Sequence, residues 1–438
     1  MRIEMPRDVE WIIEKIRNNG FEAFAVGGCV RDTLLERQPG DWDITTSAKP
    51  EEVKGIFGKT VDTGLQHGTV TIIKNRNGYE VTTYRIDGEY HDGRHPETVE
   101  FTSNLKEDLK RRDFTINAMA YSHETGIVDE FGGMDDLANR VIRCVGLAHD
   151  RFTEDALRIL RAIRFAAQLG FEIEDETYKA ISDIAPNLKN VSKERIQVEL
   201  TKLLLSDHPE KMMMVEATGI CPYVTADFGE VFDREREYLV ETGKGENCEM
   251  QSEPSAVGIE DSFAKGKTLP QEKSMRWAGF LRHMEPVKVR GILKGLKLDN
   301  ETIDNGRVMV EAAQTPLAPE KPQIRRFLSR MSRYQFEGCL YLKELDGDGD
   351  MEEIRRLWKE IEAAGDCVSL KTLAVNGGDL MEAGVPKGKQ NGENLAWLLD
   401  LVLEQPELNE KKCLLQKLEA KMEPENAGSK STFSAIES

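Results

Sequence analysis

Strand-forming patterns in this chain are confined to about the first 150 residues, and helical periodicity continues from there to about residue 425. Before that point, short apolar or alternating runs predict strands, and a polar turn at 75–78 predicts a hairpin between two of them. The expected strands are Phe21–Val26, Asp41–Thr45, Thr69–Lys74 and Tyr79–Arg85. A head of strands and helices followed by helices alone predicts the α+β fold class.

The chain is long enough for several domains. We expect a mixed-sheet head at 1–146, a helical neck at 147–205, a helical body at 206–330 and a helical tail at 331–438. Within the body, residues 225–274 are acidic and contain many Gly, Ser and Pro residues. Such segments often bury too little apolar surface to fold, so we expect this stretch to be partly disordered.

The formal net charge of the 438-residue chain is −19, from 59 basic and 78 acidic side chains. This charge opposes non-specific binding of nucleic acid, so an RNA partner would have to meet a local basic patch. No apolar run is long enough to span a membrane, and charges throughout the first turns of the chain are unlike a signal peptide. The seven cysteines form no C-x-x-C pair, which favours reduced thiols and a cytoplasmic location.

Two glycines, Gly27 and Gly28, separate an expected strand from an expected helix at 29–37. Because they lack Cβ atoms, backbone N–H groups there can approach an anion closely. Arg31, in the first turn of that helix, would add a charge-assisted donor. The arrangement suits a triphosphate, although the double glycine alone also fits an ordinary strand-to-helix turn.

Asp41 and Asp43 stand two residues apart in an expected strand, so both carboxylates point to one face. Two such carboxylates repel each other unless a cation lies between them, and hard oxygen ligands suit Mg²⁺, which also binds substrate phosphates. Two such ions can activate an attacking hydroxyl and stabilise a leaving pyrophosphate. Glu80, in the second hairpin strand, is the candidate third catalytic carboxylate, as metal ligand or base, although it fits a surface position equally well.

Residues 27–32 (GGCVRD), together with Asp41 and Asp43, resemble the first motif of the bacterial-type (class II) tRNA nucleotidyltransferases, the family of the CCA-adding enzymes and poly(A) polymerases. Residues 111–120 (RRDFTINAMA) resemble its second motif, residues 154–158 (EDALR) its fourth, and residues 195–200 (RIQVEL) its fifth. The resemblance implies a polymerase-β-like nucleotidyltransferase head. It also implies which residues hold the nucleotide: Gly28, Arg31 and Arg112 at the triphosphate, and Asp113 and Asn117 at the ribose or in ordering the pocket.

The fourth motif predicts base selection. Asp155 and Arg158 are three apart in an expected helix and therefore neighbours on its surface. Asp accepts and Arg donates hydrogen bonds, which suits the Watson–Crick edges of C and A, whereas U and G present the opposite pattern. Arg161 and Arg164 follow Arg158 at further three-residue steps, which rotate their side chains around the helix and away from Asp155. We therefore assign them to binding phosphates or to ordering Asp155 and Arg158. A salt-bridged, exposed helix face is the alternative.

Residues 86–97 contain Gly, Pro and many charges and resemble the flexible loop of CCA-adding enzymes, which in that family is needed to switch from C to A. Residues 64–69 (GLQHGT) also resemble CCA-adding enzymes rather than poly(A) polymerases. The resemblance thus implies template-independent addition of C, C and A to the 3′ end of tRNA from CTP and ATP, with Mg²⁺ and with no DNA or membrane partner. A CC-adding or A-adding enzyme, a poly(A) polymerase and a non-catalytic RNA-binding protein are the alternatives.

Overall fold

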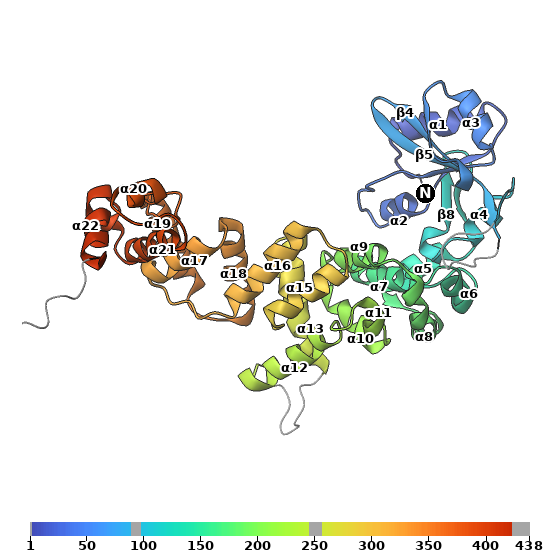
Figure 1. The fold of residues 1–438 in the computed structure, drawn as a ribbon. Helices are drawn as coiled ribbons and strands as arrows, with labels where there is room; N and C mark the ends of the chain where they lie inside the picture. Colours follow the sequence, from blue (N-terminus) through green and yellow to red (C-terminus); the bar gives the residue numbers. More distant parts are fainter. Residues whose placement is uncertain (1, 89–97, 245–255, 423–438) are drawn as a thin grey trace, which may run out of the picture. The chain divides into compact units, whose positions relative to one another are not determined.

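The structure is a computed structural model that describes residues 2–88, 98–244 and 256–422. The chain divides into two units, Met1–Asp304 and Asn305–Ser438. Strands gather in the first part of the chain and helices follow (Figure 1), which confirms the predicted α+β class. The first unit carries all the residues predicted for the site.

Seven strands of the first unit form one sheet, in the order β3-β4-β5-β2-β1-β8-β9. β2 and β5 run parallel, whereas the other neighbours run antiparallel, so the sheet is mixed as predicted. The bounds are β1 Ala23–Val26, β2 Ile44–Thr46, β3 Thr60–Gly64, β4 Thr69–Lys74, β5 Asn77–Thr83, β8 Met119–Ser122 and β9 Gly126–Asp129.

The β4–β5 hairpin forms where the sequence predicts it, but with a tighter turn. Lys74 pairs with Asn77, so only Asn75 and Arg76 form the turn, and both have positive φ (53° and 69°). Two consecutive left-handed residues give the turn that matches strand twist in two-residue hairpins. Arg76 therefore occupies a position that usually belongs to glycine.

Helices of the head pack on this sheet. α1 (Arg7–Arg17) buries one face, formed by Val9, Ile12, Ile13 and Ile16, and it contacts β1 and α3 (Pro50–Ile56). α2 (Gly28–Leu34) follows β1 directly and contacts β1 and β8. The remaining head helices are α4 (Leu105–Lys110) and α5 (Gly133–Asn139). One core cluster of the first unit contains Phe24, Tyr84 and Leu109.

The helical part of the first unit begins at α6 (Ala148–Glu154) and α7 (Leu157–Leu169). α7 packs on α9 (Lys193–Leu204), and α6 packs on α8 (Asp175–Ile184). A short parallel pair, β10 (Val141–Ile142) with β11 (Glu172–Ile173), ties the end of the head to this region. Strand structure thus extends past residue 150, where the sequence predicts helices alone.

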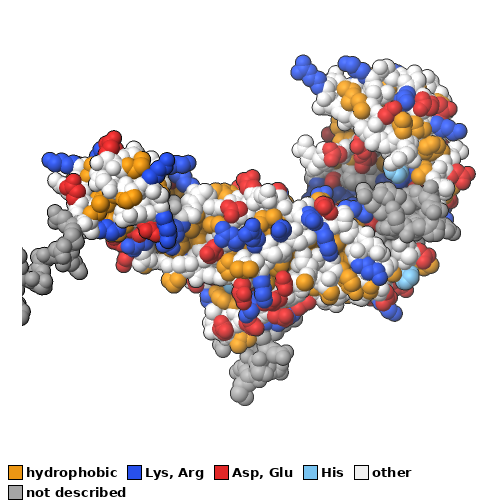
Figure 2. Space-filling model, viewed as in Figure 1, with side chains coloured by type: hydrophobic (Ala, Val, Ile, Leu, Met, Phe, Trp, Pro, Cys, Tyr) orange, Lys and Arg blue, Asp and Glu red, His pale blue; other side chains and the backbone are white. Residues whose placement is uncertain are grey.

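The described part of the acidic stretch 225–274 is helical and packed. α12 (Glu230–Thr242) buries Phe232, and α13 (Ala256–Ala264) buries Phe263, whose rings lie 5.7 Å apart. Charged side chains crowd α12 (Figure 2), where arginines pair with glutamates at the surface, whereas Glu235 of the same helix is buried. Residues 245–255 lie outside the described residues. The other helices here are α10 Met213–Ala217, α11 Cys221–Val224, α14 Lys273–Phe280 and α15 Pro286–Gly295.

The second unit is helical. α17, α18 and α19 enclose one apolar cluster around Phe336, and α20, α21 and α22 enclose another around Leu398. Their bounds are α17 Lys321–Arg330, α18 Arg333–Asp346, α19 Met351–Ala364, α20 Gly377–Glu382, α21 Lys389–Glu404 and α22 Lys411–Met422, and α16 (Asn300–Ala313) spans the boundary between the units. Among the described residues, no helix has the length and apolar character needed to cross a membrane.

Candidate active site

The chain turns between β1 and α2 at Gly27. Its φ of 82° and ψ of −130° form a conformation that glycine adopts readily and other residues avoid. The Gly27 N–H donates to the carbonyl oxygen of Met119 at 3.1 Å, which fixes the turn to β8. Gly28 is the first residue of α2, and a Cβ atom there would lie 3.7 Å from Nη2 of Arg31. The predicted glycine turn is therefore present, with Arg31 beside it.

Arg31 is buried and held on several sides. Its Nη1 donates to Oδ1 of Asn117 at 2.6 Å, and its Nε and Nη2 donate to Oδ1 of Asp32 at 2.9 and 2.8 Å. The guanidinium lies 4.9 Å from the ring centroid of Phe165 in α7. These contacts fix the position of one cation next to the turn.

Arg112 lies on the other side of the turn. A Cβ atom on Gly27 would approach Nη1 of Arg112 to 3.0 Å, so the missing side chain makes room for this guanidinium. Nη2 donates to Oδ2 of Asp108 at 3.4 Å, whereas Nε is buried and has no hydrogen-bond partner among the described residues. A buried, unpaired donor on a cation is what an anionic ligand at this turn would satisfy.

Asp41 and Asp43 are both exposed and lie just before β2, not inside a strand as predicted. The carbonyl oxygen of Asp43 accepts from the Val26 N–H at 3.0 Å, which places the segment alongside β1. The protein packed around the Asp43 carboxyl raises its pKa, Arg112 counteracts this effect, and Asp41 raises the pKa further. The two carboxylates therefore repel each other, as the sequence predicts for a cation site.

Glu80 is exposed on β5, opposite Thr71 of β4. Ile44 of β2 pairs with Val81 of β5, so Asp43 and Glu80 each stand one residue before this pair of aligned residues. Within the described ranges, no three His, Cys, Asp or Glu side chains are grouped so that they could hold a metal ion. The role of Glu80 as a third carboxylate thus stays a prediction.

Asp113 and Asn117 form a hydrogen-bonded centre between head and neck. Asp113 is buried, and its Oδ1 accepts from the Phe114 N–H at 2.9 Å and from Nδ2 of Asn117 at 3.1 Å. Its Oδ2 accepts from Nε and Nη2 of Arg161 at 2.8 and 2.5 Å. Burial raises the pKa of Asp113, but Arg161, Arg158 and Asn117 together outweigh this effect and hold the pKa well below its usual range, so this carboxyl stays ionised. Asn117 in turn accepts a hydrogen bond from Arg31, which extends this network to the glycine turn.

The predicted geometry of Asp155 and Arg158 is wrong. Asp155 is not inside a helix: it lies between α6 and α7 in extended conformation, and its Oδ1 accepts from the Leu157 N–H at 3.0 Å. Arg158 lies in the first turn of α7 and donates to Oε2 of Glu154 at 2.6 Å and to the carbonyl oxygen of Arg111 at 3.3 Å. Asp at the start of a helix is a common capping choice, so this break carried a sequence signal.

The contacts of two arginines differ from what the sequence predicts. Arg195 of α9, part of the fifth motif but not among the predicted site residues, donates from Nη2 to Oδ2 of Asp155 at 2.7 Å. Arg164, predicted to bind nucleotide, forms a buried ion pair with Glu199 of α9 and lies 3.8 Å from the Phe165 ring centroid. The structure therefore brings Arg161 to the Asp113 centre but directs Arg164 into the α7–α9 contact.

The predicted flexible loop is only partly described. Its ends pair as β6 (Arg85–Asp87) and β7 (Val99–Phe101), and residues 89–97 lie outside the described residues. The 64–69 segment runs from the end of β3 through a 3₁₀ turn at Leu65–His67. Nη1 of Arg85 donates to the carbonyl oxygen of His67 at 2.6 Å, which joins the two segments.

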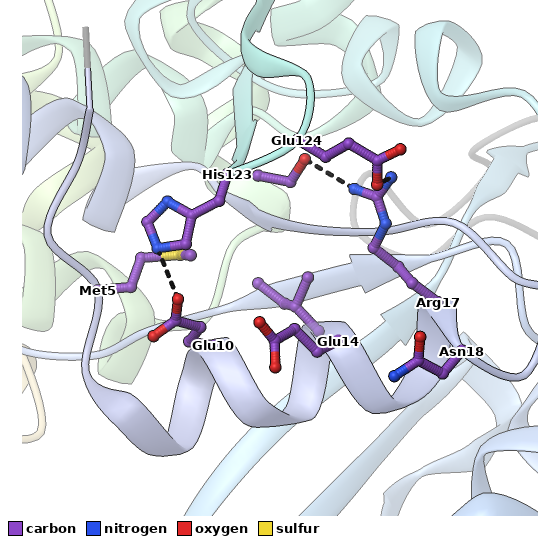
Figure 3. A pocket seen from close by; sticks show the side chains of 9 residues that line it. Met5, Glu10, Glu14, Arg17, Asn18, His123 and Glu124 are labelled. Atoms are coloured by element: carbon purple, nitrogen blue, oxygen red, sulfur yellow. Dashed lines mark hydrogen bonds and ion pairs between the residues drawn. The ribbon is translucent and has the colours of Figure 1, made fainter.

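A hollow of about 400 Å³ lies elsewhere on the head, between α1 and the turn after β8 (Figure 3). His123 reaches Glu10 at 3.1 Å across it, and Arg17 donates to Oγ of Ser122 at 2.9 Å. None of the predicted site residues lines this hollow. It is therefore distinct from the glycine turn and the paired aspartates.

Comparison with known proteins identifies the class. The family model "Poly A polymerase head domain" matches residues 23–143, "Probable RNA and SrmB-binding site of polymerase A" matches residues 170–225, and the model for tRNA nucleotidyltransferase domain 2 matches residues 269–418. Together with the mixed sheet that carries the glycine turn and the paired aspartates, these matches define a nucleotidyltransferase of the polymerase-β-like type.

Similarity over the full length specifies the family. A CCA-adding enzyme of Enterococcus faecalis is 36% identical over 406 residues, covering 92% of this chain and 93% of that protein. One of Leuconostoc mesenteroides is 52% identical over 206 residues, covering 47% of this chain and 51% of that protein. The crystal structure of the Bacillus stearothermophilus CCA-adding enzyme in complex with CTP has a TM-score of 0.76 and 30% identity, covering 95% and 99% of the two chains. The chain belongs to the family of CCA-adding enzymes, which are tRNA nucleotidyltransferases.

Proposed function

We propose that this chain adds C, C and A to the 3′ end of tRNA, using CTP and ATP without a nucleic-acid template. One observation carries the proposal: the hydrogen-bonded series Arg161–Asp113–Asn117–Arg31 connects the helix that follows Asp155 to the glycine turn. This network thus links α7, the helix that carries Arg158, to the predicted phosphate-binding Arg31, as one nucleotide site requires.

The phosphates would bind at the turn. Arg112 presents a buried Nε without a partner among the described residues, and Arg31 is held beside Gly28. Charge-assisted hydrogen bonds from arginine to phosphate are among the strongest in proteins, and Arg matches phosphate geometry with two parallel donors. These two arginines would hold the triphosphate against the turn.

Nucleotidyltransferases of this family use divalent metal ions, and we propose Mg²⁺ here. Asp41 and Asp43 fit that ion, because Mg²⁺ is usually bound by one or two carboxylates together with substrate phosphates. When bound, the ion would polarise the attacking 3′ hydroxyl and neutralise charge on the leaving pyrophosphate. Asp41 and Asp43 would hold it, with Glu80 as the candidate third carboxylate.

Asp155 and Arg158 would read the base. Asp155 is already bonded to Arg195, but each carboxylate oxygen has more than one lone-pair site and can accept a further hydrogen bond from an exocyclic amino group. Arg158 would donate to the adjacent ring nitrogen. Arg161 would order this site through Asp113, and Arg164 would act only through the packing of α7 on α9.

We further propose the domain limits 1–146, 147–205, 206–330 and 331–438 for head, neck, body and tail, and a cytoplasmic location. The six described cysteines are free thiols, which persist in reducing compartments.

Asp41→Ala tests the assignment of catalysis to this site. We expect nucleotide transfer to be lost while the variant keeps its thermal stability and its affinity for tRNA. Asp62→Ala, which removes another exposed carboxylate of the head, is the matched control and should keep full activity. Normal turnover by Asp41→Ala would contradict the proposal.

A further inference from the structure

Asp108, in α4, is the most deeply buried carboxylate near the site, and no part of the proposed mechanism uses it. Its side chain is completely buried. Isolated buried carboxylates are strongly disfavoured, so their partners indicate what they are retained for. The partners of Asp108 all come from elements that carry the site.

The two carboxylate oxygens of Asp108 serve different residues. Oδ1 accepts from Nε and Nη2 of Arg111 at 3.0 and 2.8 Å, a two-pronged ion pair that occupies the Arg111 guanidinium. Oδ2 accepts from Oγ1 of Thr45 at 3.1 Å and from Nη2 of Arg112 at 3.4 Å. Asp108 therefore treats the two consecutive arginines differently. It binds two nitrogens of Arg111 but only one nitrogen, Nη2, of Arg112.

The Asp108 contacts orient Arg112. Because Nη2 is tied to Asp108, Nη1 lies against Gly27 and Nε remains without a partner among the described residues. Thr45 is two residues beyond Asp43, so the same oxygen also ties Arg112 to the segment with the paired aspartates. We propose that Asp108 is a positioning residue that sets Arg112 toward the nucleotide triphosphate and aligns it with Asp43. This inference rests on the proposed function.

Two effects of removing the Asp108 charge oppose each other. Loss of a negative charge behind Arg112 would strengthen the attraction of a triphosphate, whereas loss of orientation would weaken its binding. The inference requires the loss of orientation to outweigh the gain in attraction. A flexible arginine side chain binds phosphate strongly only when its guanidinium donors point toward the phosphate oxygens. The sign of the change in CTP affinity therefore separates a positioning role from a purely electrostatic one.

Asp108→Asn in the full-length chain is the direct test, with CTP binding measured by calorimetry. We expect CTP to bind about tenfold more weakly, which corresponds to roughly 1.4 kcal/mol. Glu235→Gln is the matched control, since Glu235 is equally buried and is paired with Arg282 and His283 in the helical part of the first unit. It should lower thermal stability without changing CTP affinity.

A double-mutant cycle with Arg112→Ala shows whether Asp108 acts through Arg112. If it does, the double variant binds CTP no more weakly than Arg112→Ala alone. Should Asp108→Asn fail to fold, Thr45→Val takes its place in the cycle, since it removes one bond to Oδ2 and keeps the charges; about threefold weaker binding is then expected.

Additive effects, or unchanged or tighter CTP binding by the single variant, would overturn the inference while leaving the proposed function intact. If the wild-type chain itself does not bind CTP, the proposed function and the inference fail together.

Discussion

Arg195 of α9 binds the carboxylate of Asp155 at 2.7 Å, forty residues away in sequence. Asp155 stands at the break between α6 and α7, where its other oxygen accepts from the Leu157 N–H. With both oxygens engaged, the Asp155 side chain has a fixed orientation before any base arrives. Arg195 is therefore the residue through which α9 would control base selection.

Replacing Arg195 tests this relationship. Arg195→Gln should release Asp155 and reduce the preference for CTP and ATP over UTP and GTP by about tenfold, because a hydrogen bond to a charged group contributes roughly 1.5–3 kcal/mol. The measurement is incorporation of each nucleotide on a tRNA lacking its 3′ end. Arg37→Gln is the control, since Arg37 contacts the carbonyl oxygen of Gln168 in α7 without reaching Asp155. Unchanged selectivity in Arg195→Gln would contradict a role for α9.

Gly27 and Gly20 form a matched pair of glycines with positive φ, 82° and 89°. Alanine at either position strains the backbone by about 1–3 kcal/mol. Only at Gly27 would the new Cβ meet Arg112, at 3.0 Å; at Gly20 it meets nothing within 4 Å. We expect both variants to lose stability, but only Gly27→Ala to raise the KM for CTP and ATP. Equal KM values in the two variants would mean that Arg112 does not hold the nucleotide.

A variant of Arg164 shows whether this residue stabilises the fold or binds the nucleotide. Because Arg164 and Glu199 form a buried ion pair, Arg164→Met leaves a buried carboxylate without its partner and should lower the free energy of unfolding by about 3–5 kcal/mol. Chemical denaturation measures this change. Arg333→Met, which breaks an exposed pair with Glu362, should cost less than about 1 kcal/mol. A stable Arg164→Met protein with weakened CTP binding would restore the original assignment of Arg164 to the nucleotide.

The raised pKa of Asp43 predicts a dependence of stability on pH. Since the folded state disfavours the ionised carboxyl, the contribution of Asp43 to stability should fall as pH rises through and above the ordinary aspartate pKa of about 3.9. In EDTA at pH 7, Asp43→Asn should therefore unfold at a higher temperature than the wild type, and the difference should vanish toward pH 3. Added Mg²⁺ should stabilise the wild type only. A wild type more stable than Asp43→Asn in EDTA at pH 7 would contradict the repulsion between Asp41 and Asp43.

The parts of the fold with strong periodicity were predictable. The β4–β5 hairpin lies where the sequence predicts it, and the apolar residues of α1 recur at the helical spacing that its buried face requires. β3 was missed because it is an exposed edge strand without an alternating pattern. β8 was also missed, because strands buried on both faces lack the alternation that identifies a strand.

The candidate site was predictable in its residues and not in their connections. Asp41 and Asp43 were found from residue type and spacing, because a cation site requires paired carboxylates, whereas Arg112 and Asp113 were found from the resemblance to the second family motif. Bonds such as Arg161 to Asp113 join segments 48 residues apart, so no local spacing encodes them. The three-residue spacing between Asp155 and Arg158 fits a single helix, but Asp also prefers the position just before a helix begins, and the second preference decides the structure at Asp155.

The most direct measurement of the proposed function is nucleotide incorporation by the purified chain on a tRNA transcript that lacks CCA, with Mg²⁺ and each nucleoside triphosphate alone and in pairs. Products are resolved at single-nucleotide length. We expect addition to stop after three nucleotides and to require both CTP and ATP. Long tails from ATP alone, termination after two C residues with ATP present, or no extension of the tRNA would contradict the proposed CCA addition.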